Sequence, residues 1–213
     1  MRTPFVKYAV AKYAVVGALA LSLAAGGAVV AQAALTKNPA EVTAGAYELD
    51  SGHGKITWSV NHFGLSTYTG QFVNVKAELT LDPANPSAST LTATIPLTDV
   101  APNDEALKHH LQTADFFDTA NHPTATFVSR SVTVDPSDSN EATVVGDLTL
   151  KGVTKPVTIE VEFNGAGTVM GAYKAGFDGE ATIKRSDFGI NYALPAVSDE
   201  VKLHIEGEFV IQK

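Results

Sequence analysis

Six histidines are the most prominent candidates for metal binding or acid–base catalysis in this chain of 213 residues. His109 and His110 are adjacent, so on a helix their rings would point about 100° apart and could not readily share one ion. His53 and His62 lie nine positions apart, without the HExxH pattern or another ligand spacing. We therefore expect no metal site and interpret the histidines as solvated or capping side chains.

Groups for nucleophilic catalysis are also sparse. The chain contains no cysteine, which excludes thiolate nucleophiles, thiolate metal sites and a disulfide scaffold. No serine lies in a G-x-S-x-G elbow. Carboxylates such as Glu160 and Glu206 fall on polar faces where solvation explains them. The sequence predicts no catalytic residue and a protein that is not an enzyme.

One short segment, Lys184 to Gly189, combines a cation, an anion, an aromatic ring and a glycine. A local pair between Arg185 and Asp187 that closes a turn is the interpretation we favour. The alternative is a ligand-facing Arg185, because a guanidinium can pair with a phosphate or carbonyl head group.

Most of the chain alternates between apolar and polar residues with a period of two, which is typical of half-buried strands. The segment from Pro156 to Phe163 is the clearest case, with four apolar side chains on one face and Thr158, Glu160 and Glu162 on the other. Turn residues such as Asp82-Pro83 separate the strands. About eight strands are predicted, near residues 56–60, 73–81, 91–97, 128–134, 142–150, 157–163, 172–184 and 201–211.

One segment has a helical period instead. Asn103 is a plausible N-cap, and apolar residues recur at three- and four-residue spacing up to Phe117. We expect one short helix over 103–117, between the third and fourth predicted strands.

Strands with one apolar face must bury that face in a sandwich or a closed barrel. Their length favours an all-β, eight-stranded, antiparallel up-and-down barrel, whose interior either packs with side chains or holds one small ligand. Small residues on the apolar faces leave both outcomes open, because they serve either bends and close packing or an unfilled cavity. These residues are Ala77, Ala93, Gly146, Ala175, Gly179, Ala181 and Gly207.

The first 33 residues resemble a secretory signal. Three cations precede an apolar run from Ala14 to Ala31, and Ala31-Gln32-Ala33 offers a cleavage pattern. An uncleaved anchor helix is the alternative. Cleavage would remove only cations from a chain of formal charge −8, which argues against binding nucleic acid. We expect no stable membrane span after cleavage, and a flexible lead-in over residues 34–46.

Over residues 47–211 the sequence resembles the YceI-like polyisoprenoid-binding family. The resemblance rests on several motifs in order: Ile56-Thr57-Trp58-Ser59-Val60-Asn61-His62-Phe63-Gly64, Asp115-Phe116-Phe117-Asp118, Gly146-Asp147-Leu148-Thr149-Leu150-Lys151-Gly152, Arg185-Ser186-Asp187-Phe188-Gly189 and Val201-Lys202-Leu203-His204-Ile205. Two positions depart from the family pattern, since Gly54 stands where serine is usual and Trp58 where phenylalanine is usual.

The resemblance implies a lipocalin-like barrel domain over 47–213, exported to the periplasm, with a long hydrophobic pocket for an isoprenoid chain. It implies no catalysis and no cofactor beyond the bound lipid, and some relatives form homodimers. The expected ligand is a polyprenyl phosphate or an isoprenoid quinone.

From the residues we expect inward apolar side chains to hold the tail: Trp58, Val60, Phe72, Val75, Ile159, Val161, Phe177, Leu203 and Ile205. Arg185, with His62 or His110 near an opening, would hold the head group. Two other classes remain open: an outer-membrane β-barrel, with its apolar face outward, and a lipid-modifying enzyme.

Overall fold

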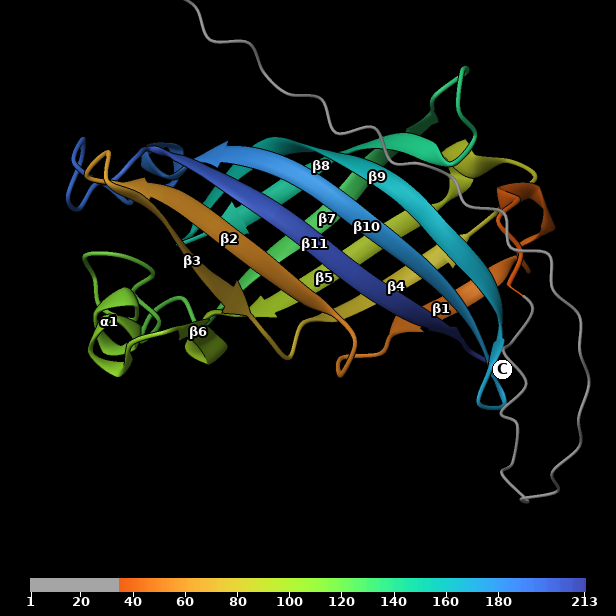
Figure 1. Ribbon diagram of the computed structural model, residues 1–213, viewed down its shortest axis with the longest axis horizontal. Coiled ribbons are helices and arrows are strands. Elements are labelled where there is room, and N and C mark those ends of the chain that lie inside the picture. The colour runs from red at the N-terminus through yellow and green to blue at the C-terminus, as the bar shows by residue number, and fades with distance from the viewer. Residues whose placement is uncertain (1–34) are drawn as a thin grey trace, which may run out of the picture. The chain divides into compact units, whose positions relative to one another are not determined.

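The computed structural model describes residues 35–213, and the predicted signal segment 1–33 lies outside them. The described chain forms one antiparallel sheet of eleven strands, which rolls up into a barrel (Figure 1). The strands are β1 (Gly45–Leu49), β2 (Lys55–His62), β3 (Ser66–Phe72), β4 (Lys76–Leu81), β5 (Thr90–Pro96), β6 (Val100–Pro102), β7 (Thr124–Val134), β8 (Glu141–Leu150), β9 (Val153–Val169), β10 (Ala172–Lys184) and β11 (Glu200–Ile211). The helices are η1 (Pro39–Glu41), η2 (Pro86–Ala88), η3 (Leu97–Asp99), α1 (Glu105–Leu111) and η4 (Arg185–Phe188).

Eight strands close the ring. β1 pairs with β4 on one side and with β11 on the other, so the order β1-β4-β5-β7-β8-β9-β10-β11 returns to its start. The predicted eight-stranded antiparallel barrel is confirmed, and all eight predicted strands are present. The order departs from a simple up-and-down sequence at one place, where β2, β3 and β6 branch from the ring.

The branch begins on β11. Residues Phe209–Ile211 of β11 pair with β1, whereas Lys202–Glu206 pair with β2. β3 and β6 then extend the sheet beyond β2. The sequence did not predict β1, β3 or β6 as strands. β1 and β6 are short. In β3, Ser66, Thr67 and Thr69 are exposed and Gly70 interrupts the face of Tyr68 and Phe72, so the alternation that marks a half-buried strand is weak.

The one α-helix among residues 35–213 lies between β5 and β7, as expected, although it is shorter than 103–117. Its N-cap is Asp104 and not Asn103, since the Asp104 carboxylate accepts a hydrogen bond of 2.7 Å from the backbone N–H of Leu107. Leu111 of α1 is buried with Trp58 and Val100. The helix therefore covers the branch and not the ring.

The two ends of the barrel differ. We call the end formed by η1, the β4–β5 turn (82–89) and the β7–β8 turn (135–140) the turn end. We call the end formed by α1, the β2–β3 turn and residues 185–199 the helix end. In Figure 1 the turn end lies at the right and the helix end at the left.

Residues 35–44, which we call the strap, lie against the turn end. Thr36 and Ala166 of β9 exchange two backbone hydrogen bonds of 2.8 and 3.0 Å. Val42 is buried against Tyr47 and Phe163. The segment predicted to be a flexible lead-in is thus tied to the barrel, because Val42 buries an apolar side chain there.

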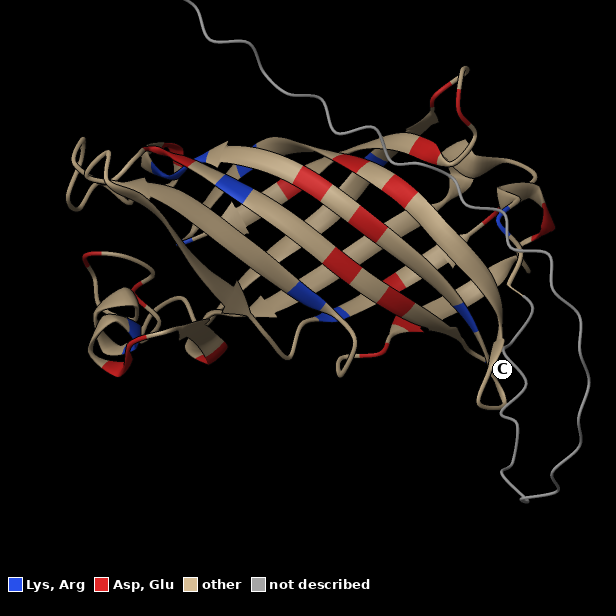
Figure 2. Ribbon diagram, in the orientation of Figure 1, with Lys and Arg blue, Asp and Glu red and all other residues tan. Residues whose placement is uncertain are grey.

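Apolar side chains of the ring strands pack together in the interior of the barrel. Figure 2 shows where Lys, Arg, Asp and Glu occur along the strands. Glu160, Glu180 and Lys202, on β9, β10 and β11, are exposed. Within residues 35–213, no helix combines the length and the apolar composition needed to cross a bilayer.

Candidate functional site: an apolar cavity with a polar mouth

The barrel interior is hollow. A cavity of about 370 Å³ runs between the inward side chains, and every strand of the ring contributes to its wall. This volume is far more than a single water needs and falls in the range of ligand pockets. Its wall is mostly aliphatic and aromatic, so the cavity suits a hydrocarbon better than a polar metabolite.

Small residues explain part of the hollow. Five of the seven small residues noted in the sequence line the cavity: Ala77, Ala93, Gly179, Ala181 and Gly207. The other two serve close packing. Gly146 lies under the ring of Phe127, where a Cβ would come within 2.8 Å of Cε2, and Ala175 is fully buried in the cluster around Tyr47. The sequence left open whether the small residues serve close packing or an unfilled cavity, and the structure shows both, at different positions.

Six of the nine residues expected to hold a lipid tail line this cavity: Val75, Ile159, Val161, Phe177, Leu203 and Ile205. Trp58, Val60 and Phe72 do not. They belong to the branch, where Trp58 is buried with Val100 and Leu111, and where Val60 and Phe72 pack against that cluster. The same period of two occurs in ring and branch strands, so the sequence pattern does not separate them.

Trp58 occupies a specific place in the branch. Its ring covers Gly70, its direct partner across β2 and β3, and stacks on Tyr68 with centroids 6.0 Å apart. A Cβ at Gly70 would lie 2.7 Å from Cε2 of Trp58. The family departure at Trp58 therefore leaves the cavity width unchanged and fills space beside a glycine.

The mouth of the cavity lies at the turn end. Among the lining residues the exposed ones are Asn38 and Ala40 of the strap, Ser139 of the β7–β8 turn, and Thr90, the first residue of β5 after the β4–β5 turn. The helix end is filled by buried side chains that include Leu97, Phe188 and Ile190. A ligand would therefore place its polar end among the turns.

Arg185 lies at the helix end and faces backbone. Its side chain is buried, and its guanidinium donates four hydrogen bonds to the carbonyl oxygens of Ser198 (2.8 Å), Ile190 (3.1 Å), Tyr192 (2.7 Å) and Val197 (2.9 Å). Burial lowers the pKa of Arg185, while the negative charge of Asp199 opposes that shift. Arg185 therefore holds the 190–198 loop, and its partners are carbonyls and not the carboxylate of Asp187.

The two histidines proposed beside it are also at the helix end. His62 is exposed at the end of β2, with its ring against Phe63. His110 pairs with Asp115 at 3.0 Å and packs edge-on against Tyr192. Arg185, His62 and His110 are not part of the cavity wall. The structure brings the three onto one end of the barrel, opposite the mouth.

The polar residues at the mouth were not singled out from the sequence. They include Asn38, Asp82, Ser89 and Asn140. Asp82 was noted only as part of a turn and Asn140 was not noted, and the only clue to a second role was that both lie in turns at the same end of the ring. That clue requires the strand order, which the sequence does not supply.

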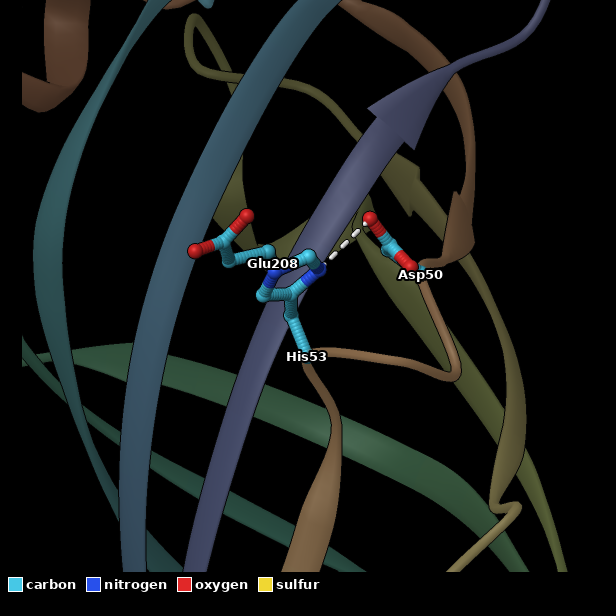
Figure 3. A group of neighbouring side chains, drawn as sticks. All are labelled: Asp50, His53 and Glu208. Atoms are coloured by element: carbon cyan, nitrogen blue, oxygen red, sulfur yellow. Dashed lines mark hydrogen bonds and ion pairs between the residues drawn. The ribbon is translucent and has the colours of Figure 1, made fainter.

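A group of potential metal ligands lies on the outer surface, where β1 ends beside β11. Oxygen and nitrogen atoms of Asp50, His53 and Glu208 lie within 4.8 Å of one another (Figure 3). The ammonium of Lys174 already bridges the two carboxylates, at 2.9 Å from Asp50 and 2.8 Å from Glu208. Hydrogen bonds from Lys174 and His53 lower the pKa of Asp50 to about 2. Because a metal ion would have to displace Lys174, we interpret the group as an ion-pair network.

Known proteins resemble this chain in sequence and in fold. Residues 47–209 match the YceI-like domain family. The chain is 39% identical to Protein YceI of Escherichia coli O157:H7 over 184 residues, which cover 85% of this chain and 95% of that protein.

Solved structures share the fold. BcnA of Burkholderia cenocepacia superposes with a TM-score of 0.66 at 27% identity, covering 75% of this chain and 98% of that chain. The YceI protein of Campylobacter jejuni gives 0.62 at 30% identity, over 72% and 90% of the chains. A polyisoprenoid binding domain from Saccharophagus degradans gives 0.57 at 14% identity, over 78% and 98%, which is a likeness of fold alone.

Proposed function

The chain belongs to the YceI-like family, and from this premise we propose that it is a periplasmic carrier that holds the tail of a long-chain isoprenoid lipid inside the barrel, without catalysis. The observation that carries the proposal is the apolar cavity, whose wall includes Val161, Phe177 and Leu203. Because the binding group is a cavity wall and not a set of reactive side chains, the protein would store or transfer its ligand unchanged.

The energetics favour a hydrocarbon ligand. Several inward side chains, among them Leu91, Val132 and Val161, are only half-buried although they face the interior of the barrel. Burying each CH₂ of a tail against such surface contributes about 0.8 kcal/mol. A chain of isoprene units therefore has enough driving force to offset the cost of ordering it.

The fold and the export signal support the rest of the proposal. The Saccharophagus degradans domain that shares this fold is a polyisoprenoid binding domain. The first 33 residues have the pattern of a secretory signal. The exposed charged residues Glu160, Glu180 and Lys202 on β9, β10 and β11, strands on which Figure 2 colours the charged positions, also favour ligand binding inside the barrel over an apolar outer wall.

The deciding experiment is extraction of lipid from protein purified without detergent, followed by mass spectrometry. We expect an isoprenoid lipid at close to one molecule per barrel. In the matched variant Ala93→Phe, a phenyl ring would fill part of the cavity, since Ala93 lines its wall, and the extracted lipid should fall at least about tenfold.

The control is Ala101→Phe, which adds the same ring at an exposed position of β6 outside the cavity. It should retain the lipid. Recovery of no chain lipid from folded wild-type protein, or equal recovery from wild type and Ala93→Phe, would contradict the proposal. Accumulation of the protein in the periplasmic fraction tests its localisation separately.

A further inference from the structure

A second hollow, of about 180 Å³, lies beside the mouth of the cavity. The two hollows share Asn140 and Phe163. They also take consecutive strap residues, since Asn38 lines the cavity and Lys37 lines the second hollow. A tail in the cavity would therefore place its polar end next to the second hollow, which we call the rim hollow.

The rim hollow is acidic. Its lining includes the carboxylates of Asp138, Glu141 and Glu162 and a single cation, Lys37. The Lys37 ammonium donates to the backbone oxygen of Asn164. Three negative charges against one positive charge repel an anionic head group. Asp82 adds a further carboxylate on the cavity side of the mouth.

Asn140, between the two hollows, has an unused acceptor. Its backbone is fixed on both sides: its N–H donates to Asp138 at 2.9 Å, and its carbonyl accepts from the N–H of Phe163 at 2.8 Å. Its side-chain oxygen Oδ1 is buried and accepts no hydrogen bond from any residue in 35–213. Buried acceptors are normally paired, so Oδ1 of Asn140 lacks the donor that a buried amide oxygen usually has.

On the basis of the proposed function, we infer that the head of the bound lipid is an uncharged hydroxyl that donates to Oδ1 of Asn140, and that the rim hollow excludes phosphate. The ligand class is then an isoprenoid alcohol or hydroquinone and not a polyprenyl phosphate. A hydroxyl supplies the donor that Asn140 lacks, and a quinone carbonyl, which only accepts, does not.

The test compares probes with one tail and different heads. Geranylgeraniol, its methyl ether, geranylgeranyl phosphate and a geranylgeranyl hydroquinone are titrated into delipidated full-length protein by calorimetry. We expect the alcohol to bind about tenfold more tightly than the ether, which cannot donate, and at least about tenfold more tightly than the phosphate. The preference over phosphate should shrink as salt is added. The hydroquinone arm separates the two sources of a hydroxyl head.

Variants test which residues cause the preference for alcohol over ether and the preference for alcohol over phosphate. Asn140→Ala should bring the alcohol to the affinity of the ether, whereas Asn140→Asp, which keeps an acceptor, should retain the difference. Glu141→Gln combined with Glu162→Gln should weaken the discrimination against phosphate several-fold. Glu160→Gln is the matched control, because Glu160 lies on the same strand outside the rim hollow, and it should leave every ratio unchanged.

The outcomes separate this inference from the proposed function. Equal binding of alcohol, ether and phosphate, or tighter binding of the phosphate, would overturn the head-group inference while leaving tail binding in place. Alcohol preference that survives in Asn140→Ala would exclude Asn140 as the acceptor. Failure of all four probes to bind folded protein would contradict the proposed function itself.

Discussion

Arg185 shows that a cation at the end of a strand can serve the backbone and not a ligand. The sequence favoured an Arg185–Asp187 pair that closes a turn, whereas in the structure the guanidinium donates to four carbonyl groups of the loop that follows η4. The planar guanidinium has donors in a fixed fork that can meet several carbonyls at once, which a lysine ammonium cannot reproduce. The substitution Arg185→Lys therefore separates the two interpretations.

We expect Arg185→Lys to lower the free energy of unfolding by about 2–3 kcal/mol, because it keeps the charge but loses most of these hydrogen bonds. Lipid affinity should not change at a temperature where both proteins are folded. Urea denaturation and lipid titration measure the two quantities. A loss of lipid affinity without a loss of stability would indicate that Arg185 binds the ligand.

Lys174 controls the acidity of Asp50 on the outer surface. The pKa of Asp50 is lowered to about 2, chiefly by its hydrogen bond from Lys174. A lowered carboxyl pKa stabilises the fold above pH 3.8, and this contribution is lost as the pH falls towards 2. The interaction therefore matters at neutral pH and disappears in acid.

In Lys174→Met, the pKa of Asp50 should rise by about one pH unit, which NMR titration of its carboxyl carbon would measure. The variant should be less stable than wild type at pH 7, and the difference should shrink below about pH 4. Lys202→Met, on the exposed face of β11, is the control and should leave the pKa of Asp50 in place. An unchanged pKa in Lys174→Met would contradict the proposed network.

At the scale of elements, the β2–β3 pair depends on the fit between Trp58 and Gly70. The indole covers the glycine so closely that a methyl group there would require the ring to move. Trp58 also leaves its indole Nε1 buried and without a hydrogen-bond partner in residues 35–213. The contact between Trp58 and Gly70 thus adds shape complementarity and apolar burial to the backbone pairing of β2 and β3, and no polar contact of the indole.

Gly70→Ala should lower the free energy of unfolding by about 1–3 kcal/mol, because it overpacks this contact. In a Trp58→Phe background the same change should cost less, since the smaller ring leaves room for a methyl group. A double-mutant cycle in urea measures this coupling, which should be at least about 0.5 kcal/mol. Additive effects of the two changes would show that the ring and the glycine do not constrain each other.

At the scale of the whole molecule, the ring and its hollow connect stability with ligand. A ligand that binds only the folded barrel stabilises it by about 2.7 kcal/mol at a concentration of 100 times Kd. For a chain of this size that corresponds to a rise in Tm of about 5–11 °C. Calorimetric scans with geranylgeraniol should show this rise in wild type and little of it in Ala93→Phe. An equal rise in both would indicate binding outside the cavity.

The sequence predicted the strands of the barrel better than it predicted which strands line the cavity. Alternation at Val157, Ile159 and Val161 predicted a strand with an inward face, and those residues line the cavity. The same alternation at Trp58 and Val60 predicted an inward face that points instead towards α1. The difference arises where β11 changes partner from β1 to β2, and such long-range pairing leaves no local trace in the sequence.

The position of the mouth was beyond the sequence for a related reason. Which end of a barrel is open depends on which turns leave space between them, and on how the strap crosses that end. Arg185, His62 and His110 were proposed for the head group because of their chemistry, whereas Asn38 fell in the predicted lead-in and Asn140 carried no prediction. Three-dimensional placement, and not residue type, distinguishes the two groups.

The polar opening at the turn end has a consequence for how a ligand is exchanged. A flexible tail must slide lengthwise past the strap, one isoprene unit after another, with its last-inserted end still facing solvent. Dwell time should then lengthen steeply with the number of units, while the exposed tip stays accessible to an enzyme or a receiving surface throughout. The barrel would then present the end of its ligand to a partner before it releases the ligand.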